Sequence, residues 1–446
     1  MTSVDLVDVV VLGLGAGGEH AARKLAEAGL AVVGVERDLV GGECPFWGCT
    51  PSKLLIRTAQ QGRSWQRAAE RIREANHDWT DAQHADPLRE AGVRVVRGHG
   101  RLSGPGRVVV ATGEGVEAYD AGLGVVLNSG TRPAVPDIPG LAGTPYWTNR
   151  DVMRQREAPE SLVIVGAGPI GAELGQAFAR FGTRVTMLEA ADRLLATEEP
   201  EACEVISAAL RREGVEIRTG ADIAHVRHDA SGFAVDVGGE TAQAQRLLVA
   251  TGRTMNLADV GLETVGLDPA ADRIETDERM RAADRLWAVG DITGHGAYTH
   301  LSLYQAQVAV RDLLGEDGPR ADYRAVTRVT FTDPEVGSVG LTEQQARAAG
   351  LRVATGHADV ARSSRGWIHE AEGIVKVVAD ADRQVLVGGT VVAPYGGEVL
   401  GLLAAAVHAE IPVPTLRGMH FAYPTFHRAV AAALAGLQTP EEPAGR

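Results

Sequence analysis

Two stretches of the chain repeat the same order of apolar and polar positions. Residues 9–38 read VVVLGLGAGGEHAARKLAEAGLAVVGVERD, and residues 162–192 read LVIVGAGPIGAELGQAFARFGTRVTMLEAAD. In each, an apolar run is followed by a glycine-rich turn, by apolar residues at helical spacing and by a second apolar run. The pattern predicts strand, turn, amphipathic helix and strand in both places. The duplicated unit indicates an α/β fold with two Rossmann-like dinucleotide-binding domains.

The rest of the chain has a short segment of α/β pattern, followed by a C-terminal part with a different pattern of apolar and polar residues. Residues 285–310 have α/β character without the full glycine pattern. Residues 328–342 and 373–392 alternate like antiparallel strands, and a helical pattern follows at 396–410. We therefore predict a first nucleotide-binding part at 1–146, a second nucleotide-binding domain at 147–265, a return to the first domain at 266–320, and a C-terminal α+β domain at 321–446.

The glycines of both turns suit a loop that binds phosphate. Gly13 permits the tight bend, Gly15 lets the backbone approach a pyrophosphate, and Gly18 lets the helix pack on the strand. The N-terminus of the helix then offers free N–H groups to the phosphate. The second turn repeats the arrangement with Gly166, Gly168 and Gly171.

Each second strand ends in an acid, Glu36 in the first unit and Glu189 in the second. An acid about 20 residues beyond the glycines can accept a hydrogen bond from a ribose 2′-OH. Two such sites indicate two dinucleotides, and a flavin with a nicotinamide makes chemical sense because hydride passes between the two rings. The Glu189 carboxylate would repel a 2′-phosphate, so we expect NADH; Arg184 and Arg193 lie nearby, and NADPH stays an alternative.

Composition narrows the partners and the location. The 446 residues are 45% hydrophobic and 23% charged, which is typical of a soluble protein with more than one core. The formal charge of −14 disfavours nucleic acid and anionic membrane as partners. No apolar run reaches the length of a membrane span, and the acidic N-terminal residues do not resemble a signal peptide. A cytoplasmic location is therefore expected.

Two of the three cysteines, Cys44 and Cys49, lie in GGECPFWGCTPSK at residues 41–53. A zinc clip would need four ligands, and no second cysteine pair exists, so no resident metal is expected. The spacing alone leaves two interpretations open: the cysteines are either two inert buried thiols or a redox-active pair. Pro51 suits the first turn of a helix, and a cysteine at a helix N-terminus has a lowered pKa. We adopt the interpretation of a reactive pair beside a flavin.

These segments together resemble the class I pyridine nucleotide–disulfide oxidoreductases. That family includes dihydrolipoamide dehydrogenase, glutathione reductase, mercuric reductase and the soluble transhydrogenase. The resemblance covers nearly the whole chain in order, through GLGAGG, the cysteine segment, NSGTRPAVPDIPG, GAGPIGAE, ATGRTMN, AVGD and FTDPEVGSVGLTE. Asn128 and Ser129 depart from the Ala and Thr that the third of these segments has in the family.

The resemblance implies a homodimeric FAD enzyme with a C-terminal dimerisation domain. NADH would reduce FAD from one face, and FAD would reduce a Cys44–Cys49 disulfide on the other. Cys49 would be the thiol next to the flavin, and Cys44 the thiol that meets a small-molecule electron acceptor. Lys53 would pair with Glu173 near the flavin N5. The resemblance also assigns cofactor contacts to Gly42, Lys53, Gly130, Gly252, Arg253, Gly290 and Asp291, the last through the ribityl chain.

The C-terminal segment departs from the family. Where the dihydrolipoamide and glutathione enzymes carry HPTxxE, this chain has HFAYPTFHRAV, with Tyr423 in place of the His and Arg428 in place of the Glu. The acid–base dyad is absent, and a phenol is a weak base at neutral pH although it can donate a proton. Tyr423 is the catalytic candidate at this position, with His420 and His427 as alternatives.

The loop between the cysteines is also unusual, because Pro45, Phe46 and Trp47 fill it with bulk. These side chains either pack the core or wall the site and offer a flat surface to an aromatic substrate. The segment that follows the cysteine helix is short, which would reshape the approach of a substrate.

The residues predict an NAD(P)H-dependent FAD oxidoreductase that passes electrons through Cys44 and Cys49 to a small disulfide or another acceptor. The alternative is a diaphorase-type enzyme, in which a quinone or metal ion takes electrons from the flavin directly. A non-catalytic redox sensor that kept the fold is a third hypothesis.

Overall fold

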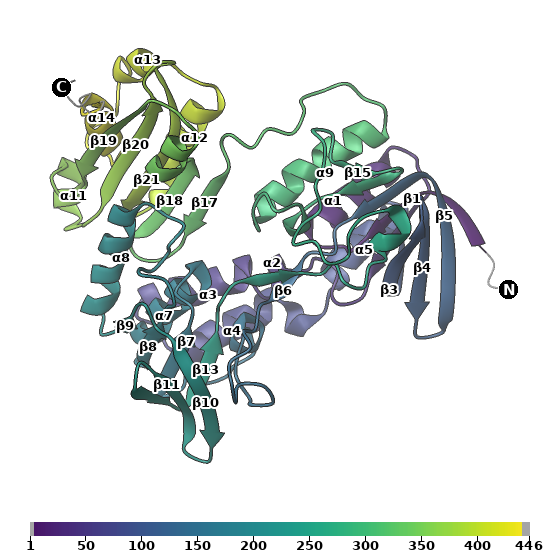
Figure 1. Cartoon of the computed structure of the whole chain (residues 1–446), viewed down its shortest axis with the longest axis horizontal. Helices are drawn as coiled ribbons and strands as arrows, with labels where there is room; N and C mark the ends of the chain where they lie inside the picture. The colour runs from purple at the N-terminus through teal and green to yellow at the C-terminus, as the bar shows by residue number, and fades with distance from the viewer. Residues whose placement is uncertain (1–3, 439–446) are drawn as a thin grey trace, which may run out of the picture.

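The computed structural model describes residues 4–438, and its first unit is built on a seven-stranded sheet. The strand order is β1-β2-β3-β4-β5-β16-β15, and β1 also pairs with β5. The strands are β1 (Val4–Leu12), β2 (Val32–Glu36), β3 (Arg94–Gly104), β4 (Arg107–Thr112), β5 (Gly115–Leu127), β15 (Arg281–Ala283) and β16 (Leu286–Ala288). Helices α1 (Ala16–Glu27) and α9 (Thr299–Leu313) pack together beside this sheet (Figure 1). The buried face of α1, with Ala21, Ala22 and Leu25, follows the apolar spacing of the sequence.

The residues between β2 and β3 form a group of helices that carries the cysteines. They are α2 (Glu43–Phe46), α3 (Cys49–Gln60), α4 (Trp65–Ala75), the short η1 (His77–Trp79) and α5 (Ala82–Glu90). α4 begins where the Ser64 side chain accepts the N–H of Arg67, as a helix N-cap does. In Figure 1, α2, α3 and α4 lie between the first unit and the second, whereas α5 lies beside α1 and β3 of the first unit.

The second unit repeats the nucleotide-binding architecture on a smaller sheet of order β13-β7-β8-β9, next to an antiparallel sheet β10-β11-β12. Its elements are α6 (Asn149–Met153), β7 (Ser161–Val165), α7 (Pro169–Arg180), β8 (Arg184–Leu188), α8 (Pro200–Arg212), β9 (Glu216–Arg218), β10 (Ile223–Asp229), β11 (Gly232–Val237), β12 (Glu240–Ala244) and β13 (Arg246–Val249). Two connecting strands, β6 (Thr131–Pro133) and β14 (Arg253–Met255), pair with each other between the units. The chain rejoins the first core at Leu257, and η2 (Leu262–Val265) and η3 (Asp291–Thr293) follow.

The third unit is an antiparallel five-stranded sheet of order β17-β18-β21-β20-β19 with helices packed on it. Its elements are β17 (Thr327–Thr330), β18 (Glu335–Gly340), α10 (Glu343–Ala348), β19 (Val353–Asp359), α11 (Ser364–Ile368), β20 (Ile374–Asp380), β21 (Val385–Ala393), α12 (Gly396–His408), α13 (Val413–Arg417) and α14 (His427–Ala435). The α/β class with two Rossmann-like units and a C-terminal α+β unit is confirmed.

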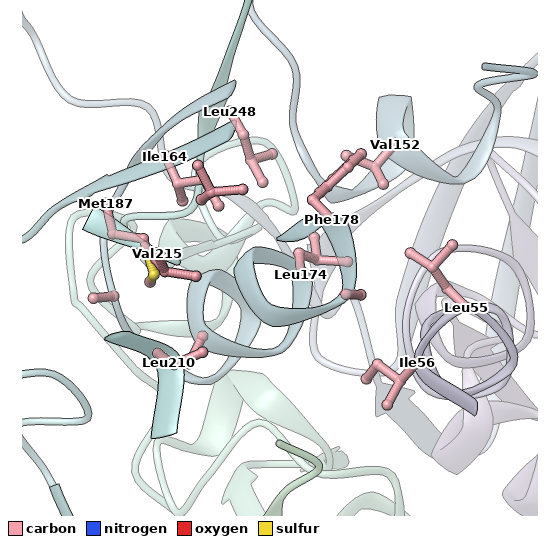
Figure 2. Packing of buried hydrophobic residues seen from close by; sticks show 14 of the residues in the cluster. Leu55, Ile56, Val152, Ile164, Leu174, Phe178, Met187, Leu210, Val215 and Leu248 are labelled. Atoms are coloured by element: carbon pink, nitrogen blue, oxygen red, sulfur yellow. The ribbon is translucent and has the colours of Figure 1, made fainter. Parts of the chain in front are cut away.

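One hydrophobic core joins the cysteine helix to the second nucleotide-binding unit. Leu55 and Ile56 of α3 belong to the same buried cluster as Leu174 and Phe178 of α7 (Figure 2). Leu55 and Phe178 are fully buried, so α3 and α7 cannot slide without opening a void. This packing fixes the distance between the cysteines and the second glycine turn.

A buried charge cluster fastens the third unit to the second. The ammonium group of Lys376 on β20 is 3% exposed and contacts Glu199, Glu201 and Glu343 at 2.8–2.9 Å. Burial of a charge is costly unless it is paired, so the cluster fixes how the two units meet. Within residues 4–438, no helix is both long and apolar enough to cross a membrane.

Candidate active site

The first glycine turn, between β1 and α1, is packed so tightly that only glycine fits. Gly13 has a φ of 92°, and a Cβ there would collide with the carbonyl of Asn128. A Cβ on Gly18 would collide with the carbonyl oxygen of Gly13, as expected where a helix packs on a strand. A Cβ on Gly42 would lie 2.9 Å from the Cα of Gly15, so two backbones meet here without side chains.

The second glycine turn repeats this geometry between β7 and α7. Gly166 has a φ of 98°, and a Cβ there would lie 2.5 Å from the carbonyl oxygen of Ala250. A Cβ on Gly171 would collide with the carbonyl of Gly166. A Cβ on Gly168 would face open space, which leaves the turn accessible to a ligand.

The two predicted ribose acids make matching contacts with their own turns. The Glu36 carboxylate accepts the N–H groups of Leu14 at 2.8 Å and of Asp38 at 2.7 Å. The Glu189 carboxylate accepts those of Ala167 at 2.6 Å and of Ala191 at 2.8 Å. Burial raises the pKa of Glu36, although these N–H groups oppose the shift. Each acid therefore holds its glycine turn in shape and keeps lone pairs for a further donor.

The cysteine segment places its two thiols in different environments. Cys49 is the first residue of α3, and its Sγ lies 3.3 Å from Thr299 Oγ1 at the start of α9. A hydrogen bond from the Cys44 thiol, helped by Thr299 and the Lys53 charge, lowers the pKa of Cys49 to about 6. The same bond, together with burial, raises the pKa of Cys44. Cys49 is thus the more acidic thiol of the pair.

Lys53 and Glu173 form an ion pair across α3 and α7, with Lys53 Nζ 2.8 Å from Glu173 Oε2. Glu173 is buried, and its other oxygen accepts the N–H of Phe331 at 2.8 Å. The Lys53 ammonium also lies 4.6 Å from the centre of the Phe331 ring. The pair therefore links the cysteine helix, the second unit and the third unit.

A cavity of about 1020 Å³ connects most of these groups. Its lining includes the first glycine turn, Glu36, both cysteines, and the ion pair of Lys53 with Glu173. Gly42, Gly130, Arg253 and Asp291 line it too, whereas Gly166, Gly168, Gly171 and Glu189 lie outside the lining. The second glycine turn itself does not line the cavity. Residues of the helix that follows it, between Pro169 and Leu174 of α7, do line the cavity.

Two of the remaining predicted cofactor residues, Arg253 and Asp291, are joined through Thr131 at one wall of the cavity. The Thr131 hydroxyl donates to Asp291 at 2.6 Å, and Arg253 Nε donates to the same hydroxyl at 2.5 Å. A Cβ on Gly290 would lie 2.6 Å from the amide oxygen of Asn128, whereas Gly130 and Gly252, both with positive φ, face open space.

The cavity residues fit a flavin dinucleotide. The volume is at the upper end of the roughly 300–1,000 Å³ of small-molecule sites. Gly15 and Gly42 keep one wall free of side chains, so that a pyrophosphate could approach the backbone. The Ser129 hydroxyl, in the same lining, is buried with no hydrogen-bond partner among the described residues. An orphaned polar atom of this kind needs a ligand or water to pair with.

The aromatic residues of the loop between the cysteines are buried, as the core-packing hypothesis expects, although Trp47 also lines the cavity. Phe46 is fully buried, and Trp47 is 7% exposed. The Trp47 ring stacks on Trp79 with centroids 6.0 Å apart, and the Arg154 guanidinium lies 4.6 Å from its centroid. Trp47 lines the cavity, but because its side chain is almost fully buried it presents little open ring surface to an aromatic substrate.

Tyr423 lies apart from the cavity within this chain. It is 73% exposed on the third unit, and its hydroxyl donates to Ser364 Oγ at 2.8 Å. Neither it nor His420, His427 or Arg428 is among the residues that line the cavity. Its role stays a prediction that depends on a second subunit.

Sequence reasoning missed several residues that shape the site. Thr299 contacts Cys49 across 250 positions of sequence. The Glu43 carboxylate, next to Cys44, accepts from Arg150 Nε at 2.6 Å and lies 3.3 Å from the Arg253 guanidinium. Only the position of Glu43 inside the cysteine segment could have drawn attention to it.

The fold and the site define a class of protein: an oxidoreductase with two dinucleotide sites and a dithiol between them. The chain belongs to the pyridine nucleotide-disulphide oxidoreductase family. Residues 7–312 match the model of that family, and residues 326–434 match the model of its dimerisation domain. It is therefore an FAD-dependent oxidoreductase that uses NAD(P)H, as the residues predicted.

Relatives of several named activities are similar to the chain. Dihydrolipoyl dehydrogenase of Chlorobaculum parvum is 31% identical, with 97% of each chain covered. Mercuric reductase of Streptomyces lividans is 31% identical, with 96% of this chain and 95% of the relative covered. A Cu(II) complex of RclA, an HOCl-induced flavoprotein disulfide reductase from Escherichia coli, superposes with a TM-score of 0.88 at 28% identity, covering 97% of this chain and 99% of that one.

Proposed function

We propose that the protein carries electrons from NADH through FAD to the Cys44–Cys49 pair, and from there to a small acceptor that reacts with a dithiol. The observation that carries this proposal is the placement of Cys49 at the start of α3, facing Thr299, in the cavity that fits a flavin. A bystander thiol would have no reason to hold a low pKa at that wall.

Each residue of the site has a stated part in this cycle. Bound FAD would accept hydride from the nicotinamide and deliver two electrons to the disulfide. The S–S bond would break on taking up these two electrons and the proton that the hydride carried, which leaves Cys49 as thiolate and Cys44 as thiol. Thr299 and Lys53 stabilise the Cys49 charge, and Glu173 holds Lys53 in place. Gly13, Gly15, Gly42 and Asp291 would hold the flavin nucleotide.

Among acceptors, the proposal favours a metal ion that binds thiolates. Exchange with an organic disulfide needs a group that takes the Cys44 proton, and Tyr423 is a weak base for that task. A metal ion displaces thiol protons directly to water. Mercuric reductases are among the relatives, and the RclA structure is named as a Cu(II) complex. Two Cu(II) ions would take one electron each as the disulfide forms again.

Two further assignments belong to the proposal. NADH is the preferred donor, because Glu189 would repel a 2′-phosphate and the nearby Arg193 already contacts Asp192. The active form is a homodimer, in which Tyr423 of the partner subunit would reach the cysteines and donate a hydrogen bond to the acceptor.

The test is NADH oxidation with a panel of Cu(II), small disulfides and quinones, comparing wild type with Cys44→Ser. The proposal expects Cu(II)-dependent turnover that Cys44→Ser lowers by at least about 100-fold. Turnover with quinone alone, unchanged in Cys44→Ser, would support the direct flavin route and refute the dithiol route.

A further inference from the structure

The turn between the cysteines is held by two asparagines that lie outside the cysteine segment. The Asn149 amide donates to the carbonyl of Trp47 at 2.9 Å, and the Asn76 amide donates to the carbonyl of Phe46 at 3.1 Å. Asn149 is 6% exposed and Asn76 is 1% exposed. In the described part of the chain, no backbone N–H of a turn or loop donates to either carbonyl.

The segment that follows Asn76 adopts a costly conformation to reach this turn. His77, Asp78 and Trp79 have φ values of 45°, 53° and 59°, a left-handed run that non-glycine residues avoid. This run turns the chain so that Asn76 can hydrogen-bond to the carbonyl of Phe46 while Trp79, three residues later, stacks on Trp47. Strain of this kind persists where the surroundings enforce it, and it gathers at functional sites.

We propose that Asn149 and Asn76 are positioning residues of the redox-active pair, which hold the intercysteine turn so that Cys49 stays at the first position of α3 against Cys44 and Thr299. This inference rests on the proposed function, because it assigns the two amides to the same dithiol. The described hydrogen bonds of both amides go to carbonyl oxygens and not to a sulfur atom, so each would act through the carbonyl that it binds.

The physical reason is that the two carbonyl oxygens need hydrogen-bond donors. They belong to the residues just before α3, and a carbonyl oxygen without a donor carries its negative end into a buried region. The amide groups satisfy both oxygens and prevent the peptide units from turning. Without them the turn would relax, and Cys49 would lose the short contacts that stabilise its charge.

Other charged groups near Cys49 are kept constant in this comparison. They are Lys53 on α3, Glu173 on α7, Glu43 on α2, Arg150 on α6 and Arg154 directly after α6, with Thr299 the polar contact from α9. Neither asparagine hydrogen-bonds to any of these side chains. A change in the Cys49 titration after substitution of an asparagine therefore reports on the turn.

The experiment measures the alkylation rate of Cys49 by iodoacetamide against pH in the reduced holoenzyme, with the modified peptide identified by mass spectrometry. The variants are Asn149→Leu and Asn76→Leu, and Asn149→Ser and Asn76→Ser serve if the leucine variants do not fold. Gln176→Leu is the control, because Gln176 is a buried amide that hydrogen-bonds to Glu213 and Asp333 and to no residue of the cysteine segment.

We expect the midpoint of the wild-type profile to lie below the ordinary thiol value and to rise by about one pH unit in each asparagine variant. The double variant should shift by less than the sum, because both amides act on one turn. Gln176→Leu should leave the midpoint within about 0.2 units of wild type.

The outcomes separate the two proposals. An ordinary midpoint near that of free cysteine in the wild type would refute the thiolate assignment and the proposed function with it. A low wild-type midpoint that the asparagine variants leave unchanged would overturn the positioning role alone. An equal shift in Gln176→Leu would also overturn it, because any lost buried amide would then have the same effect.

Discussion

The ion pair of Lys53 and Glu173 gives a quantitative test of how the cysteine helix is held. Lys53→Met would leave the Glu173 side chain, 6% exposed, with only the N–H of Phe331 as a donor. At the observed 2.8 Å, the gross attraction at an effective dielectric of 20 is about 6 kcal/mol. Desolvation offsets most of it, and the Lys53 side chain is 35% exposed, so screening by solvent reduces it further. We expect a net coupling of about 1–2 kcal/mol.

Urea denaturation of the holoprotein at saturating FAD, followed by circular dichroism, measures this coupling as a double-mutant cycle. Lys53→Met should lower the free energy of unfolding by about 2–3 kcal/mol, because it strands a buried carboxylate. Adding Glu173→Gln should recover about 1–2 kcal/mol of that loss. Arg57→Met is the control: Arg57 is an exposed cation on the same helix, whose hydrogen bond to Gln60 is long at 3.5 Å. Additive single effects, or an equal loss in Arg57→Met, would refute the reasoning.

Three further predictions concern pH, cofactor choice and the contact between units. The pKa of Cys49 is lowered to about 6, so its thiolate should be present above that pH and lost below it. The rate of acceptor reduction at substrate saturation should therefore fall about tenfold from pH 7 to pH 5. A rate that does not change over this range would contradict the assignment. Glu189→Ala should lower the ratio of kcat/KM for NADH to that for NADPH by about tenfold, measured with one acceptor, and an unchanged ratio would show that the acid does not select the nucleotide. Lys376→Met should reduce the free energy of unfolding by about 3–5 kcal/mol, whereas Arg352→Met, at an exposed pair, should cost less than about 1 kcal/mol; equal effects would contradict the account of the buried cluster.

The fold could be predicted because its signals are local. The apolar run before Gly13, the glycines themselves and the acid at the end of the next strand all lie within one short segment. The same holds for the second turn and for the alternating strands of the third unit. Spacing and resemblance together brought Cys44, Cys49, Lys53 and Glu173 to one place before any coordinates were known.

The parts that could not be predicted depend on tertiary contacts. Thr299 meets Cys49 only because the first residue of α9 lies beside the first residue of α3, and nothing near Thr299 in the sequence indicates this. Asn76 and Asn149 are single polar residues without a pattern, and their partners are backbone carbonyls, which leave no trace in a sequence. Tyr423 illustrates a third limit, since its expected position belongs to an assembly of two chains.

The direction of the bulky side chains in the cysteine loop could not be predicted from the sequence either. Trp47 read equally well as core or as substrate wall, because bulk alone does not say which way a side chain points. The structure shows that its ring is buried and packs against Trp79 and the Arg154 guanidinium.

The central claim is that the dithiol accepts electrons from the flavin, and an anaerobic titration of the purified protein with NADH tests it most directly. The absorbance of the flavin and its long-wavelength thiolate band would be followed in wild type and in Cys49→Ser. The account predicts that wild type consumes about two two-electron equivalents per FAD and develops the long-wavelength band. Cys49→Ser should consume about one equivalent and bleach without the band. Consumption of about one equivalent by both proteins would contradict the account, because the cysteines would then take no part in the electron transfer.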